Sequence, residues 1–223
     1  MLRSQQSASL VELIERTASV QPSQQQMMAM MQQIHSFTVV YVWAAVVPAL
    51  LVLLGITVYA HRRYPRLFNR IVWGLVAGLV ATVGLELIRL PGVLGGAFPG
   101  DMPAMFGQMI SGQQGATALL AGYSYHFLNG ATFALMYTLL FGKARWYWGV
   151  AWGLFFEFGM MISPPVLMAA GAFGVRGFWP ELFVVTFAAH VIFGAIFGLL
   201  AERKVSHRGG IFSTLRPPEK TAK

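Results

Sequence analysis

The chain has 223 residues, of which 56% are hydrophobic and only 11% are charged. Soluble domains carry about a quarter charged residues, so this composition excludes an ordinary soluble fold and indicates an integral membrane protein. The net charge of +8 does not indicate a nucleic-acid-binding protein, because the basic residues stand in short loops between apolar runs and in the C-terminal segment.

Residues 1–36 form a polar segment rich in Gln, Ser and Met, which lacks the early apolar core of a signal peptide. Within it, Met27, Met31 and His35 share one face if the segment is a continuous helix. Thioether and imidazole groups suit Cu(I), so these three residues are a candidate copper site on the outer side of the membrane. The alternative is that the methionines are pliable apolar side chains on a partner-binding or interfacial surface.

Five apolar runs of about 20 residues follow, each long enough to cross a bilayer as a helix. The predicted helices span 37–60, 71–90, 116–141, 146–169 and 180–201. They define a transmembrane domain over 37–203 and leave 204–223 as a basic tail. The predicted fold class is therefore all-α, an integral membrane bundle of five transmembrane helices.

The basic residues predict the orientation of this bundle. They fall in the loop after the first helix, the loop after the third helix and the C-terminal tail, which all lie on one side in a five-helix topology. Since basic loops face the cytoplasm, the N-terminus is expected outside and the C-terminus inside. The protein is thus predicted to be a multi-pass protein of the cell membrane, with its tail in the cytoplasm.

Two sequence patterns occur twice, in the same order. W-G-x3-G begins at Trp73 and again at Trp148, and H-x3-G-A-x-F-x-L begins at His126 and again at His190. The patterns indicate a tandem repeat of two helices, in which the second and third helices correspond to the fourth and fifth. Such repeats are related by a pseudo-two-fold axis along the membrane normal. The alternative is chance, because membrane sequences are rich in Gly, Ala and Phe.

Three ionisable residues fall near the middle of the predicted bilayer. At about 1.5 Å per residue, His126 and His190 lie about nine residues into their helices and Glu157 about ten. Ionisable groups at this depth are costly and nearly always face the bundle interior. A shallower pair, Glu86 and Arg89, stands three residues apart and is predicted to form a structural ion pair.

The two histidines leave three interpretations open. They can pack in small-x3-small helix interfaces, where each imidazole bonds across the interface. They can bind haem b through one axial imidazole each. They can also act with Glu157 as a proton relay, in which Asn129, one turn from His126, orients the ring.

No enzyme class is indicated by the motifs of the chain. It has no G-x-S-x-G elbow, no H-E-x-x-H and no P-loop, and it has no cysteine that could act as a nucleophile. We therefore expect a non-catalytic accessory subunit of a larger membrane complex, such as an electron-transfer assembly. The alternatives are a haem- or copper-binding membrane protein and a small proton-coupled transporter. The expected partners are the lipid bilayer and either other protein subunits or further copies of this chain.

Overall fold

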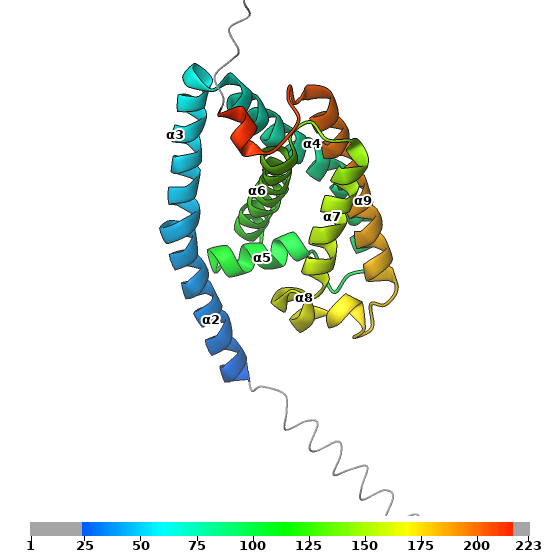
Figure 1. Cartoon of the computed structure of the whole chain (residues 1–223). Coiled ribbons are helices and arrows are strands. Elements are labelled where there is room, and N and C mark those ends of the chain that lie inside the picture. Colours follow the sequence, from blue (N-terminus) through cyan, green and yellow to red (C-terminus); the bar gives the residue numbers. More distant parts are fainter. Residues whose placement is uncertain (1–23, 216–223) are drawn as a thin grey trace, which may run out of the picture.

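The computed structural model describes residues 24–215, apart from the side chains of 24–28, 30, 31, 164 and 165. This part of the chain is built from helices and contains no strand (Figure 1). A π-helical turn at Val42–Val46 joins the first two helices, and short 3-10 turns follow α8 and α9. The helices are α2 (Gln24–Tyr41), α3 (Val47–Arg63), α4 (Pro65–Leu94), α5 (Met102–Ser111), α6 (Ala116–Phe141), α7 (Trp146–Met161), α8 (Pro164–Ala169) and α9 (Glu181–Lys204).

Three helical segments are long and apolar enough to cross a membrane: Gln32–Arg63, Pro65–Leu94 and Glu181–Lys204. A fourth is counted if Trp146–Met161 and Val166–Gly174, which meet at a bend of 51°, make up one broken span. The predicted all-helical membrane protein is confirmed at this level, whereas five spans are not. The helix α6 has the predicted range 116–141 but is not among these segments, because polar residues lower its mean hydropathy.

The four longest helices after α3 pack side by side in the order α6, α4, α9, α7. Glycines bring the backbones of neighbouring helices together. A Cβ atom at Gly78 of α4 would collide with the backbone of Gly130 in α6, and one at Gly149 of α7 would collide with that of Gly194 in α9. Close packing at small residues is the usual way for membrane helices to associate.

The ends of this row, α6 and α7, meet through aromatic side chains instead. The ring of Phe133 in α6 stacks on the ring of Phe156 in α7, with 3.8 Å between the centroids. The indole nitrogen of Trp152 donates a hydrogen bond of 3.0 Å to the carbonyl oxygen of Phe133. Since large rings separate α6 and α7, their backbones approach less closely than those of the glycine-lined pairs.

The continuous rod of α2 and α3 stands beside the bundle (Figure 1). At one end, Nδ1 of His35 lies 3.0 Å from the carbonyl oxygen of Met109 in α5, a contact in which the imidazole donates. At the other end, Ala60 is buried against the start of α4. Between these contacts the most apolar window of Gln32–Arg63 has no buried residue, so most of the surface of α3 faces outwards from this chain.

The segment after α9 folds back over the ends of α4 and α6. Val205 is buried, and the guanidinium of Arg70, also buried, donates to the carbonyl oxygens of Leu139, His207 and Arg208 at 3.2–3.3 Å. The predicted tail over 204–223 therefore begins with a docked segment, which the structure describes as far as residue 215.

Candidate functional site

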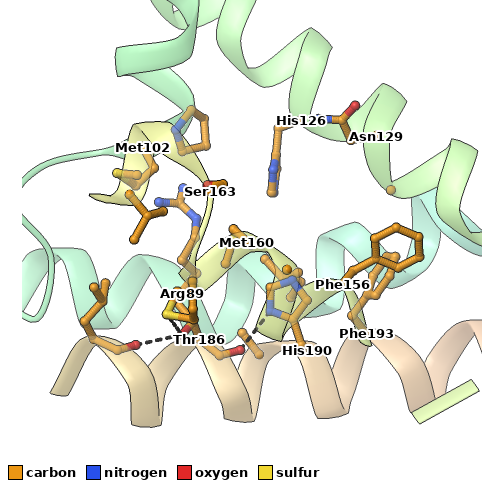
Figure 2. Close-up of a pocket in the computed structure, with 18 of the residues that line it drawn as sticks. Arg89, Met102, His126, Asn129, Phe156, Met160, Ser163, Thr186, His190 and Phe193 are labelled. Atoms are coloured by element: carbon orange, nitrogen blue, oxygen red, sulfur yellow. Dashed lines mark hydrogen bonds between the residues drawn. The ribbon is translucent and has the colours of Figure 1, made fainter. Parts of the chain in front are cut away.

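A cavity of about 920 Å³ lies among α4, α6, α7 and α9, and residues of α5 and α8 complete its wall. This volume is within the range of small-molecule binding sites. The wall is largely apolar and includes eight phenylalanine rings, among them the stacked Phe133 and Phe156. Figure 2 shows His126 and His190 entering the cavity from opposite helices, α6 and α9. The two histidines singled out from the sequence thus line one cavity.

Each imidazole has a carboxylate behind it. Nδ1 of His190 lies 2.8 Å from Oε2 of Glu157, and Nε2 of His126 lies 2.7 Å from Oε1 of Glu86. The histidines line the cavity and the two carboxylates do not. Each histidine therefore stands between the cavity and a buried acid, and Thr186 and Arg89, which bond to Glu157 and Glu86, also line the cavity.

Glu157 is completely buried, and its polar neighbours come from α9. The hydroxyl of Thr186 lies 2.6 Å from Oε1 of Glu157 and 2.8 Å from the carbonyl oxygen of Leu182. Nδ1 of His190 lies 2.9 Å from the carbonyl oxygen of Thr186 as well as close to Glu157. Thr186 and His190 reach the same carboxylate because they are four residues apart on one helical face.

This arrangement suits two protonation states of the Glu157–His190 pair. A charged Glu157 can accept from the Thr186 hydroxyl and from Nδ1 of His190. A neutral Glu157 can instead donate to the Thr186 oxygen, while the hydroxyl proton turns to Leu182 and Nδ1–H to the carbonyl oxygen of Thr186. Both states are therefore satisfied without movement of the helices.

No lysine or arginine of the described residues forms an ion pair with Glu157. A buried carboxylate without a partner charge is very costly. Glu157 is therefore stable either as the neutral acid or as a carboxylate beside a protonated His190.

Glu86 has a permanent cation as its partner. Nε and a terminal nitrogen of Arg89 donate to its two oxygens at 2.8 and 2.7 Å, so the ion pair predicted from the sequence is confirmed. Arginine stays charged in proteins, and its planar fork fits a carboxylate with two parallel bonds. The charge of Glu86 is thus compensated whether or not His126 carries a proton.

Arg89 also ties α5 to the bundle. It donates to Oδ1 of Asp101 at 2.8 Å, and the hydroxyl of Tyr123 donates to Oδ2 of the same carboxylate at 3.1 Å. Asp101 immediately precedes α5, so this network fixes the start of α5 beside α4 and α6. The Glu86 site is thus a structural network, whereas Glu157 has no Lys or Arg partner among the described residues.

The two carboxylate–histidine pairs are built with the same spacing. In each, the glutamate follows by eight residues a glycine of its own helix, and that glycine packs on the glycine four residues after the histidine. The residues are Gly78, Glu86, His126 and Gly130 in one pair and Gly149, Glu157, His190 and Gly194 in the other.

Sequence reasoning identified both histidines, Glu157 and Asn129, and Asn129 also lines the cavity. It missed Glu86 as the partner of His126 and Thr186 as a partner of Glu157. The eight-residue spacing from Gly78 to Glu86 and from Gly149 to Glu157 was visible in the sequence and could have indicated the first of these. No hydrogen bond within the described residues joins Asn129 to His126, so Glu86 is the polar group that orients this imidazole.

The candidate metal ligands are only partly covered. Met27 and Met31 belong to α2, but their side chains lie outside the described residues, and His35 contacts Met109 through Nδ1. Within the described part, no three His, Cys, Asp or Glu residues are grouped as metal ligands. In the cavity, Nδ1 of His126 and Nε2 of His190 are the ring nitrogens without a carboxylate beside them and would be the ones available to haem b.

Comparisons of the chain with protein-family models, with curated proteins and with solved structures found no match.

Proposed function

We propose that this protein is a small proton-coupled carrier of the cell membrane, with the cavity as its substrate site. The observation that carries this proposal is the Glu157–His190 pair. It is buried, lacks a permanent cation among the described residues and suits two protonation states, and its imidazole lines the cavity. Intramembrane acid–histidine pairs of this kind are typical of proton relays in pumps and transporters.

The position of His190 gives a physical reason for coupling. A molecule in the cavity contacts this imidazole and thereby changes the free energy of the charge that the Glu157–His190 pair carries. Protons and substrate then influence each other's affinity, and the influence is equal in both directions. His126 faces the same cavity from α6, where Glu86 and Arg89 hold it in place.

We also propose that α6 and the broken α7–α8 segment cross the membrane, which gives five spans with the N-terminus outside. The docked segment after α9 supports this topology. Arg70, near the start of α4, binds the backbone of His207 and Arg208, and Gly142 at the end of α6 pairs with Arg208. The three basic regions of the sequence thus lie close together at one end of the bundle, as the positive-inside rule requires of cytoplasmic segments.

The tandem repeat is a further part of the proposal, in a modified register. The W-G-x3-G pattern aligns Gly78 with Gly153, whereas the packing pairs Gly78 with Gly130 and Gly149 with Gly194. If Gly78 corresponds to Gly149, the two glutamates and the two histidines also correspond. In this alignment the residues of α7 are shifted by one helical turn from the positions that the W-G-x3-G pattern gives them. We therefore propose a duplication whose two halves later acquired helices of different length.

The carrier function can be tested in vesicles that contain the purified protein, a pH-sensitive dye and an imposed pH gradient. A panel of aromatic dyes that are cationic, neutral or anionic is added outside, and the internal pH is recorded. We expect at least one class to dissipate the gradient in wild-type vesicles and none to do so with Glu157→Gln. If no class of dye dissipates the pH gradient, or if the gradient dissipates equally with Glu157→Gln, the proposed carrier function is wrong.

A second candidate function is that of an accessory subunit in a larger membrane complex. The observation in its favour is the rod of α2 and α3, which contacts the rest of the described chain near its ends and leaves its most apolar window unburied. Purification in mild detergent tests this function. A partner that copurifies in a fixed ratio would support it, and a chain that runs alone as a stable monomer would contradict it.

A further inference from the structure

We infer that the ligand of the cavity is a lipophilic organic cation, which exchanges with a proton held by the Glu157–His190 pair. The inference rests on the proposed carrier function and names the substrate class of the same site. It is argued from the charges around the cavity and from the chemistry of its wall.

The charged groups around the cavity disfavour the binding of an anion. One guanidinium and three carboxylates give a net charge of −2 when both imidazoles are neutral, and zero when both are protonated. An anion would therefore face a neutral or negative surrounding of low polarity, where charges interact strongly. The titratable and charged groups that line the cavity or lie directly behind its wall are Glu86, Arg89, Asp101, Tyr123, Tyr125, His126, Glu157 and His190.

The wall of the cavity supplies what a poorly hydrated cation needs. Eight phenylalanine rings line it, and two of them, Phe156 and Phe193, lie near His190 (Figure 2), with Phe133 stacked on Phe156. The faces of aromatic rings attract cations, and this attraction is strongest where water is excluded. The apolar body of the ligand would contact the rings while its charge is balanced by the acids behind the histidines.

Charge balance also sets the stoichiometry of exchange. With both imidazoles protonated the site is neutral, and it stays neutral if a monovalent cation enters as one proton leaves. Glu157–His190 is the pair whose proton the cation replaces, because Glu157 has no permanent cation among the described residues and its charge must be balanced by either the proton or the ligand, whereas Arg89 balances Glu86 in every state. A neutral ligand would require no such exchange, so proton coupling itself favours a cation.

Two probes of the same shape and opposite charge test the inference: tetraphenylphosphonium and tetraphenylborate, added to the full-length protein in detergent. Calorimetry in two buffers with different ionisation heats reports both the dissociation constant and the protons released. We expect saturable phosphonium binding, release of one proton per cation, and affinity that rises about tenfold per pH unit while the free site is protonated. Tetraphenylborate should not compete.

Glu157→Gln should remove the proton release and the pH dependence of phosphonium binding. Glu181→Gln is the matched control, because Glu181 is an exposed carboxylate at the start of α9, away from the cavity. If Glu157→Gln does not fold, proton release by the wild type still decides the question. Preferential binding of the borate or of neutral triphenylphosphine oxide would contradict the inference that the ligand is a cation, but it would leave the proposed carrier function standing. If phosphonium binds without release of a proton, ligand binding is not coupled to the proton, and the proposed carrier function is wrong as well.

Discussion

Glu157 in α7 and His190 in α9 are 2.8 Å apart, with the carboxylate fully buried and the imidazole on the wall of the cavity. Among the described residues, no permanent cation neutralises this acid. The Glu86–His126 pair has the same spacing but includes Arg89. The proposed carrier function assigns proton exchange to the first pair, whereas the second pair holds the bundle together.

We expect Arg89→Gln to destabilise the protein by about 3 kcal/mol or more, because it leaves Glu86 and Asp101 buried or half-buried without a cation. The apparent melting temperature in detergent reports the effect. Replacing Arg89 and Glu86 together by Met and Leu should recover part of the loss, since the unpaired acid is then also removed. A melting temperature unchanged by Arg89→Gln would show that this network is not structural.

The sequence predicted much of this arrangement, and the limits of that prediction are physical. The range of α6 and the pair of cavity histidines followed from hydropathy and from the repeated motif. The partners of those histidines did not, because Glu86 precedes His126 by 40 residues and meets it only through the register of α4 against α6. That register is set by backbone contacts at Gly78, which hydropathy does not report.

The predicted fourth helix over 146–169 shows another limit. The structure ends α7 at Met161 and begins α8 at Pro164, and the two segments meet at a bend. Proline lacks a backbone N–H, and its ring disfavours helical geometry in the residue before it. The sequence therefore marked the break through Pro164 and Pro165, but the direction of the bend depends on how α8 packs against the rest of the wall.

Gly149→Leu should greatly reduce the yield of folded protein, because its Cβ atom would meet the backbone of Gly194. Gly55→Leu is the matched control, since nothing lies within 4 Å of a Cβ at that position in α3. Fluorescence-detected size-exclusion chromatography compares the two variants directly. If both variants fold equally well, the close approach of α7 and α9 would be wrong. If Gly55→Leu alone fails, α3 would be in contact with a partner at that position.

The proposed carrier function predicts that the purified protein is colourless and free of stoichiometric iron or copper, because the cavity would hold an exchanging ligand, and within the described part no three His, Cys, Asp or Glu residues are grouped as metal ligands. An absorbance spectrum and elemental analysis of protein purified from cells supplied with both metals provide the test. A Soret band that disappears in both His126→Ala and His190→Ala would instead assign the cavity to haem b. Stoichiometric copper lost on replacing His35 would indicate a site at the N-terminal segment.

His190→Gln should bind ligands in the cavity with an altered dependence on pH, whereas His126→Gln should keep the dependence of the wild type. The reason is that Glu157 relies on His190 for its partner charge, while Glu86 has Arg89. Titration of tetraphenylphosphonium binding against pH for the two variants measures the difference. If only His126→Gln loses the pH dependence of tetraphenylphosphonium binding, the proton is bound at His126 in α6 instead.

The central claim is that a proton on the Glu157–His190 pair is coupled to occupation of the cavity. The most direct test is the internal pH of vesicles that carry wild type, Glu157→Gln or Glu181→Gln when the same cationic dye is added outside. The account predicts ligand-driven proton flux in wild-type and Glu181→Gln vesicles and none in Glu157→Gln vesicles. Equal proton flux in all three would contradict it.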